Sequence, residues 1–234
     1  LTTLFCAGLA LLFALQAAVL ALVSPAQLGL RIILFACLWV TFEWLRTWLL
    51  TGFPWLFAGY IALDTVMAGW APVIGVLGVS WLTAVTASGV AEIMADKCAS
   101  GGITLASWIV SITGAGYLLS SVQWTEPTGE ARKVAIYQPN IALEYTWDRN
   151  TAPILLNDFL EHAKAYAPSA DLVVWPEGAL PFYFDQAPGY MSELRRIASS
   201  NDGTIVTGMP TRSGNRRFNS IVSIDQSSQT YIKQ

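Results

Sequence analysis

One carboxylate, Glu177, has surroundings in the sequence that could support chemistry. It follows the apolar run 171–175 (DLVVW) and a proline, and a glycine comes directly after it. Polar residues just past the ends of buried strands often carry chemistry in α/β sheets. Partial desolvation beside Trp175, Phe182 and Tyr183 would suit this carboxylate to act as a general base. An ordinary loop acid is the equal alternative on the residues alone.

Other residue types offer weaker chemistry. Asn140 and the loop 211–217 also follow expected strand ends, and three arginines in that loop could hold a phosphate, although a solvated loop is the default interpretation: Arg212, Arg216 and Arg217. The single histidine, His162, lies one helical turn from Asp158, and we expect it to be solvated. A Ser-His-Asp triad or a zinc site needs a better-placed histidine or more ligands. We therefore expect no metal and no cofactor.

The cysteines and the overall charge exclude further classes. Cys6 and Cys37 lie in apolar stretches as small packing residues, and Cys98 lies in a short loop. An odd count of three implies no disulfide framework. The net charge of −3 shows no basic stripe, so a nucleic-acid partner is not expected.

Composition divides the elements that carry these residues into two parts. The 234 residues are 54% apolar, and residues 1–124 hold 7 charges against 22 in residues 125–234. The first part is therefore too apolar for a water-soluble fold. A helix of about 20 residues crosses a bilayer, and four stretches reach that length: 1–23, 32–50, 71–91 and 103–122.

Basic residues in the short loops predict the orientation of these spans. Arg31 lies between the first two spans and Lys97 between the last two, which indicates that both loops are cytoplasmic. Residues 51–70 and everything after 122 then lie on the outer side. Glu43 and Arg46, three apart on one face of the second span, can pair at membrane depth as a functional site. The alternative is an interfacial ion pair in an aromatic belt formed by Trp44, Trp48, Phe53 and Trp55.

After a polar linker, the pattern in the second part alternates between strands and helices. Strands are expected at 133–138, 171–175, 204–208, 218–224 and 229–233, and helices at 151–167 and 190–200. Such alternation predicts an α/β layer fold. The domains are thus a membrane region at 1–124 and an α/β domain at 131–234.

Several short motifs follow one another in order along the chain. They are 43–46 (EWLR), 51–55 (TGFPW), 59–60 (GY), 137–141 (YQPNI), 173–181 (VVWPEGALP), 218–220 (FNS) and 231–233 (YIK). Together they resemble the bacterial apolipoprotein N-acyltransferases, in which a carbon–nitrogen hydrolase (nitrilase-like) domain lies on the outer side of the inner membrane. The resemblance implies an α-β-β-α sandwich for the second domain and a multi-pass protein of the bacterial inner membrane.

The resemblance also implies a Glu–Lys–Cys triad. Glu177 would be the general base, and Lys233 would stabilise the oxyanion and the thiolate of a cysteine that carries the acyl chain as a thioester. Trp147 matches a family tryptophan near the substrate, although Thr146 stands where a lysine is common. No cysteine follows Cys98. We therefore expect a fragment that lacks both ends, with a hydrolase domain incomplete at the C-terminus, that is inactive alone.

The implied reaction moves a fatty acyl chain from a phospholipid to the α-amino group of the N-terminal diacylglyceryl-cysteine of an apolipoprotein. The expected partners are therefore the phospholipid donor, the apolipoprotein acceptor and membrane lipid, and a monomer is expected. Two other functions stay open. One is a membrane-tethered amidase or nitrilase that acts on a small amide, and the other is a non-catalytic membrane scaffold.

Overall fold

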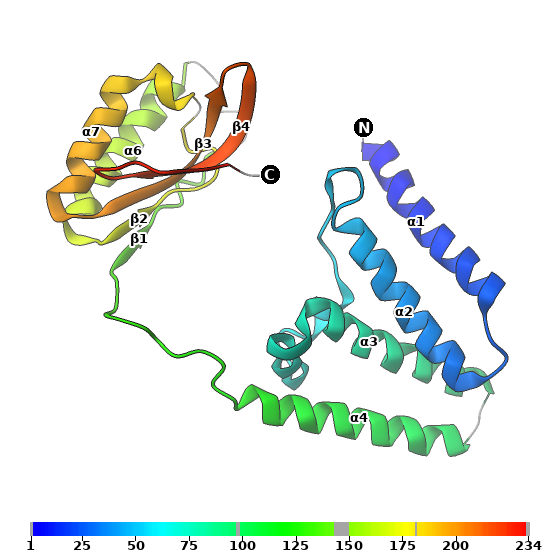
Figure 1. Ribbon diagram of the computed structural model, residues 1–234. Helices are drawn as coiled ribbons and strands as arrows, with labels where there is room; N and C mark the ends of the chain where they lie inside the picture. Colours follow the sequence, from blue (N-terminus) through cyan, green and yellow to red (C-terminus); the bar gives the residue numbers. More distant parts are fainter. Residues whose placement is uncertain (1, 97–98, 143–149, 181, 233–234) are drawn as a thin grey trace. The chain divides into compact units, whose positions relative to one another are not determined.

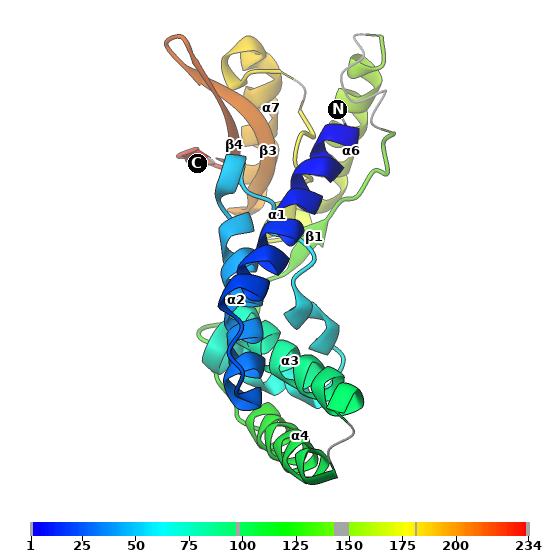
Figure 2. The ribbon, with the colours of Figure 1, turned by 90° about the vertical axis from the view of Figure 1, so that its right-hand side faces the viewer.

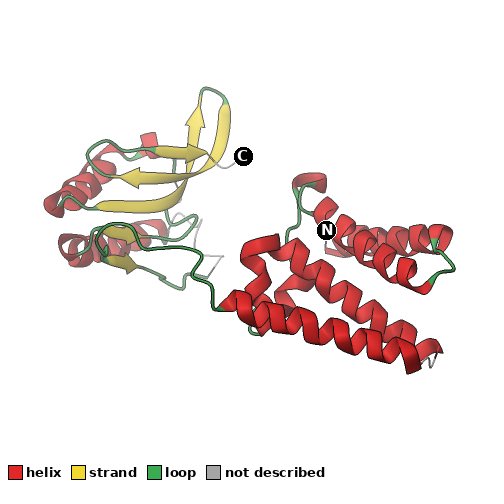
Figure 3. Ribbon diagram, turned by 60° about the horizontal axis from the view of Figure 1, so that its bottom comes forward, coloured by secondary structure: helices red, strands yellow, loops and turns green. Residues whose placement is uncertain are grey.

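The computed structural model describes residues 2–96, 99–142, 150–180 and 182–232. The chain forms two compact units, Leu1–Pro127 and Thr128–Gln234. Among the described residues, strands occur in the second unit only, whereas the first is built from helices and turns (Figure 3). The predicted fold class, apolar helices followed by an α/β domain, is confirmed.

The described residues of the first unit contain four long helices, and all four are apolar and long enough to cross a membrane. They are α1 (Thr2–Val23), α2 (Leu28–Arg46), α3 (Ala71–Asp96) and α4 (Ala99–Ser120). Helix α1 lies alongside α2 (Figures 1 and 2), and α3 packs against both α2 and α4. Helices with apolar residues on all sides are typical of membrane spans.

The start of α2 and the end of α3 are joined by an ion pair. Arg31 lies in the first turn of α2 rather than in the expected loop, and its Nε and Nη2 donate to Glu92 Oε1 and Oε2, each at 2.5 Å. Such a bidentate pair is stronger and more directional than a single contact. The chain before α2 and the chain after α3 therefore lie at the same end of this helix pair.

The segment between α2 and α3 folds into three short 3-10 turns, Leu49–Thr51, Ala58–Ala62 and Val66–Trp70. Helix α2 ends at Arg46, short of the expected residue 50, and the Arg46 carbonyl accepts a hydrogen bond from Phe53 N at 2.5 Å. Gly59 N donates to Ser80 Oγ of α3 at 2.8 Å. A Cβ on Gly59 would clash with the backbone of α3, so this close approach requires glycine.

The second unit contains a five-stranded mixed sheet in the order β1-β2-β3-β4-β5. Its strands are β1 (Val134–Ile136), β2 (Leu172–Val174), β3 (Thr204–Ser213), β4 (Arg216–Ile224) and β5 (Thr230–Ile232). The first three are parallel, with Val173 opposite both Ala135 and Ile205. The last three are antiparallel. All five expected strands are therefore present.

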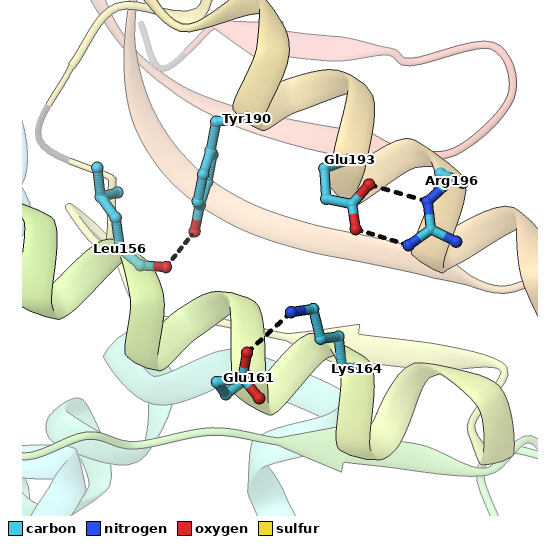
Figure 4. A network of polar contacts seen from close by, with 6 residues as sticks. All are labelled: Leu156, Glu161, Lys164, Tyr190, Glu193 and Arg196. Carbon is cyan, nitrogen blue, oxygen red and sulfur yellow. Dashed lines mark hydrogen bonds and ion pairs between the residues drawn. The ribbon is translucent and has the colours of Figure 1, made fainter.

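In the part of this unit that the structure describes, α6 (Ala152–Tyr166) and α7 (Pro188–Ala198) cover one face of the sheet. Short 3-10 turns lie at Ala167–Ser169, Phe184–Gln186 and Ser199–Asn201. The helices meet where Tyr190 of α7 donates to the Leu156 carbonyl of α6 at 2.8 Å (Figure 4). Their buried faces form the core with inward residues of the strands: Phe159, Ala163, Met191, Leu194, Val173, Ile205 and Val222. Beside that core, burial raises the pKa of Tyr190.

The expected loop 211–217 is a β-hairpin instead. Strands β3 and β4 form one long hairpin (Figure 2). They pair out to Ser213 and Arg216, with Arg212 opposite Arg217. Gly214, with φ +58°, opens the two-residue turn, as in hairpins with glycine at the first turn position. The expectation was wrong because polar side chains on an exposed ladder resemble a loop in sequence, although their backbones pair.

Candidate functional site

Glu177 lies just past the carboxyl end of β2, where the chain continues alongside β3. Trp175 N donates to the Val206 carbonyl at 2.9 Å, and Gly208 N donates to the Pro176 carbonyl at 3.4 Å. These two bonds extend the parallel pairing beyond Val174 and hold the backbone that carries the carboxylate. The predicted position at a strand end is thus observed.

Two glycines make this path possible. A Cβ on Gly208 would lie 2.6 Å from the Cα of Glu177, closer than real Cβ contacts come, so β3 needs glycine there. Gly178 has φ +72°, a backbone conformation that favours glycine. The sequence around Glu177 is therefore adapted to a sharp and closely packed turn.

The Glu177 carboxylate points to β4. Asn219, opposite Pro210 in the β3–β4 ladder, donates from Nδ2 to Glu177 Oε1. Both side chains line a hollow of about 400 Å³ together with Trp175, Gly208, Ser220 and Tyr231. An amide that donates to one carboxylate oxygen fixes the direction of the other, which is what a general base requires.

Val206, Ile221 and Tyr231, which line this hollow, lie outside the core that α6 and α7 cover, and Glu177 is exposed. The partial desolvation expected from the sequence is therefore absent. Described residues of this unit leave the face uncovered: Ile136, Ile221 and Tyr231 are 77%, 50% and 67% exposed. Phe182 and Tyr183 are only half-buried themselves and do not line the hollow.

Two of the predicted site residues, Lys233 and Trp147, lie outside the described residues, as does Cys98. The described part of β5 ends at Ile232, which pairs with Ser220, and Ser220 is the neighbour of Asn219. Asn140 is described and exposed, with φ +52°, but it does not line the hollow. Of the predicted site residues, the structure therefore places Glu177 and leaves the roles of Lys233 and Trp147 as predictions.

His162 is half-buried in aromatic contacts, whereas the sequence predicted a solvated side chain. Its ring stacks on Tyr137 with a centroid distance of 4.1 Å and lies 4.6 Å from the ring of Tyr166. Trp175 Nε1 donates to His162 Nδ1 at 3.3 Å. The expectation failed because His162 lies three residues after Phe159, on the edge of the buried face of α6, where strand ends contribute aromatic partners.

The arginine cluster is divided between an ion pair and solvent. Arg212 donates to Asp185 Oδ2 from Nε at 2.8 Å and from Nη2 at 2.5 Å, and its guanidinium lies 5.5 Å from the ring centre of Tyr183. Arg216 and Arg217 are exposed. Arg212 thus connects the hairpin to the segment that follows Glu177, so this cluster does not form a phosphate site of three free arginines.

In the first unit, Glu43 and Arg46 form a buried pair. They are 2% and 6% exposed, with Arg46 Nη2 3.9 Å from Glu43 Oε1. The same oxygen accepts hydrogen bonds from Trp39 Nε1 at 2.9 Å and Ala58 N at 2.7 Å. The carboxylate therefore anchors the turn segment after α2. The pair is thus buried within this unit at the end of α2, and both the functional role and the interfacial ion pair stay predictions.

Other chemistries find little support among the described residues. Cys6 and Cys37 are free and exposed, and both belong to α1 and α2 rather than to the unit of Glu177. The described ranges contain no group of three histidine, cysteine, aspartate or glutamate side chains that could hold a metal ion.

Sequence reasoning assigned no role to two contacts at this site. Asn219 belongs to a motif that was recognised, but its contact with Glu177 follows from the register of β3 and β4. His162 contacts Trp175 because α6 crosses the end of β2. The sequence feature that could have indicated the Asn219 contact is an amide in the strand that precedes the expected lysine. The feature that could have indicated the His162 contact is its helical spacing of three residues from Phe159.

Comparisons with known proteins match both units. Residues 1–89 match the family model of the apolipoprotein N-acyltransferase N-terminal domain, and residues 133–234 match the carbon–nitrogen hydrolase model. Curated proteins named apolipoprotein N-acyltransferase are similar over nearly the whole chain. That of Pseudomonas syringae pv. tomato is 38% identical over 253 residues, which cover 100% of this chain and 48% of the relative.

Two further relatives with the same name give the same picture. The protein of Pseudomonas aeruginosa strain LESB58 is 36% identical over 241 residues, 98% of this chain and 46% of its own length. That of Methylococcus capsulatus is 31% identical over 251 residues, 100% of this chain and 47% of its own length. The chain thus spans about half the length of the curated relatives it matches.

Proposed function

Because the chain belongs to the apolipoprotein N-acyltransferase family, we propose that the protein transfers a fatty acyl chain from a phospholipid to an apolipoprotein. The acceptor is the α-amino group of the N-terminal diacylglyceryl-cysteine. The observation that carries this proposal in the structure is the position of Glu177. Its carboxylate lies past a strand end, is held by Asn219 and lines a hollow of about 400 Å³.

In the proposed first half-reaction, Glu177 accepts the proton of a cysteine thiol, and the thiolate attacks the ester carbonyl of the phospholipid. The acyl C–O bond breaks, and the alkoxide of the lysophospholipid leaves with the proton from Glu177. A thioester stays on the cysteine. This chain has no cysteine after Cys98, so the nucleophile is a group that the described site does not supply.

In the second half-reaction, the α-amino group of the acceptor attacks the thioester and Glu177 accepts the amine proton. The C–S bond breaks, and Glu177 returns this proton to the departing thiolate, so that the cysteine thiol and the carboxylate are both regenerated. Lys233 is proposed to stabilise the oxyanion in both steps, because a compact ammonium favours developing negative charge. Its place in the chain supports this role. It follows Ile232, whose ladder partner Ser220 adjoins the Asn219 that contacts Glu177.

The membrane helices support a lipid donor. Four helices of sufficient length and apolarity precede the hydrolase unit, and a phospholipid substrate is dissolved in the bilayer that they would span. We propose the bacterial inner membrane as the location, with the 51–70 segment and the hydrolase unit on the outer side. A monomer and a substrate contact for Trp147 belong to the same proposal.

The test replaces Glu177 by glutamine in a form of the protein that transfers acyl chains in detergent. Without a general base, transfer from labelled phospholipid to a diacylglyceryl peptide should fall by about 10²–10⁴-fold. The matched control is Glu161→Gln, which removes an exposed carboxylate paired with Lys164 on α6 (Figure 4) and should leave transfer unchanged.

The outcome also separates the alternatives. Retention of more than half of the activity in Glu177→Gln would contradict the proposed role of this residue. Release of ammonia from small amides that depends on Glu177, without acyl transfer, would favour a tethered amidase. Absence of both activities in a form of the protein that includes the nucleophilic cysteine would favour a scaffold.

A further inference from the structure

His162 occupies an aromatic site between α6 and the ends of two strands. Tyr137, just past β1, stacks on one side of the imidazole at 4.1 Å and 22°, and Tyr166 lies on α6 at 4.6 Å. Trp175, just past β2, donates its indole N–H to Nδ1 at 3.3 Å. The ring is therefore held by contacts from two strands and its own helix, although the sequence around it resembles a solvated helical face.

The contact with Trp175 selects one protonation state of His162. An indole N–H can only donate, so Nδ1 must carry a lone pair, and the proton of the neutral imidazole lies on Nε2. Burial lowers the pKa of His162, whereas the charge of Asp158 raises it. A protonated ring would present N–H to N–H at this contact and lose the hydrogen bond.

The charged groups near His162 and the Tyr137 hydroxyl have partners. Asp158 accepts a hydrogen bond from Tyr137, which raises the pKa of Tyr137 to about 12, so the phenol stays neutral. On α6, Glu161 pairs with Lys164, and on the adjacent α7, Glu193 pairs with Arg196 (Figure 4). Asp158 is thus the charge that bears most directly on the imidazole.

Trp175 connects this site to Glu177. Its side chain is 3% exposed, its ring packs on Phe159 at 4.9 Å, and its backbone N–H bonds to Val206. It also lines the hollow that contains Glu177, two residues further along the chain. The indole that contacts His162 and the carboxylate of Glu177 are therefore carried by one short backbone segment, residues 175–177.

We propose that neutral His162 is a positioning residue for Glu177, acting through its hydrogen bond with Trp175. Protonation of His162 releases the indole, loosens the end of β2 and lowers the activity of the site in acid. This inference rests on the proposed function for its catalytic consequence only. The contact and its pH response are properties of the folded chain.

The first test needs no activity. His162 is the one histidine of the chain, so selective ¹⁵N labelling gives unambiguous imidazole signals. We expect the Nε2–H tautomer and a titration below the ordinary value of about 6.5. Trp175→Phe removes the donor to the neutral ring and should raise that pKa, whereas Asp158→Asn removes a negative charge and should lower it. An Nδ1–H tautomer, or a titration that Trp175→Phe leaves unchanged, would overturn the contact.

The second test measures the strand end itself. The amides of Trp175 and Gly208, which bond to Val206 and Pro176, should lose protection from hydrogen exchange as His162 becomes protonated. His162→Asn is the matched variant, because asparagine places an acceptor oxygen where Nδ1 lies and does not titrate. In this variant, the protection of these two amides should not change with pH and should equal that of wild type at neutral pH. Equal loss in both proteins would contradict the proposed transmission.

The third test links this response to acyl transfer. A misplacement of 1 Å can cost up to about 10²-fold in rate, and we expect wild type to lose about tenfold more activity than His162→Asn on acidification. His162→Phe should show the lower rate at all pH values. If the rate of acyl transfer falls equally in wild type and in His162→Asn as the pH is lowered, the positioning role is refuted. Absence of transfer at any pH, with the NMR and exchange results as expected, would refute the proposed function and leave the contact standing.

Discussion

At the scale of single residues, the site depends on groups that aim Glu177 rather than on Glu177 alone. Asn219 donates to one oxygen of the carboxylate, and Gly208 permits the backbone of β3 to approach its Cα. Glu177 is exposed in this unit, so contacts rather than burial determine its direction, and these two are among them. Both roles can be tested without changing the carboxylate.

We predict that Asn219→Leu lowers acyl transfer by about 10- to 100-fold, because a hydrogen bond to a charged group contributes about 1.5–3 kcal/mol. The fall should appear in kcat rather than in KM for the phospholipid, since the amide contacts the base and not the lipid. Asn215→Ala, at the exposed tip of the β3–β4 hairpin, is the control. A KM effect with unchanged kcat would show that Asn219 binds substrate instead.

We predict that Gly208→Ala displaces Glu177 and destabilises the second unit by about 1–3 kcal/mol, the usual cost of overpacking. The added Cβ would lie 2.6 Å from the Cα of Glu177, and backbone cannot rotate away as a side chain can. Gly189→Ala is the matched control, because a Cβ there meets nothing within 4 Å. Thermal unfolding and acyl transfer are the measurements, and equal behaviour of the two variants would contradict the prediction.

The sequence predicted Glu177 but not its neighbours, for a physical reason. A strand end followed by Pro-Glu-Gly is a local pattern, and a local pattern can be recognised in the sequence without knowledge of the fold. The contacts of Asn219 with Glu177 and of His162 with Trp175 join residues 42 and 13 apart in the chain. Those contacts depend on the register of the β3–β4 ladder and on where α6 crosses β2. The spacing of apolar residues along the sequence predicts neither.

At the scale of elements, alternating apolar patterns predicted the strands and helices, but not how the antiparallel part is extended. The β3–β4 hairpin continues to Ser213 and Arg216 although its outer residues are polar and exposed. Arg212 forms an ion pair because of this extension, since the longer hairpin brings its guanidinium to Asp185. A turn with Gly214 at positive φ is the local feature that makes the longer hairpin possible.

The turn between β4 and β5 controls where β5 begins. Asp225 Oδ1 accepts hydrogen bonds from Ser227 N at 2.7 Å, Ser227 Oγ at 2.9 Å and Ser228 N at 2.8 Å. The bond from the Ser228 backbone, with the smaller contribution of Ser227, lowers the pKa of Asp225. Because β5 pairs with β4 directly after this turn, the turn determines which residues of β5 lie opposite β4.

We predict that the contribution of Asp225 to stability is complete above the ordinary aspartate pKa of about 3.9 and is lost as the pH falls through the lower folded value. Asp225→Asn keeps the acceptor oxygen but not the charge, so it should remove this part of the pH dependence. Asp225→Ala should weaken hydrogen-exchange protection of β5 at neutral pH as well. If Asp225→Ala and wild type show equal protection there, the turn does not register β5.

At the scale of the whole molecule, membrane orientation decides which compartment supplies the substrates. The Arg31–Glu92 pair places the chain before α2 and the chain after α3 at one end of that helix pair. Lys97 and Cys98 follow α3 directly, outside the described residues. Loops with basic residues favour the cytoplasm, so the proposed orientation places this end inside and residues 51–70 outside.

We predict that Cys98 reacts in intact cells with a membrane-permeant thiol reagent and not with an impermeant one. Cys6→Ser and Cys37→Ser leave Cys98 as the only thiol of the three in the chain. The matched reporter is Asp64→Cys in a background without the other cysteines. Asp64 is exposed in the segment between α2 and α3, so an impermeant reagent should label that variant from outside.

Labelling of Cys98 by the impermeant reagent, with protection at position 64, would reverse the orientation. An odd number of membrane crossings between Cys98 and the hydrolase unit would place the two on opposite sides of the membrane. Helix α4, which lies between them in the chain, is long enough to make one such crossing. The reversed result would therefore place Glu177 in the cytoplasm, away from acceptors exported across the membrane.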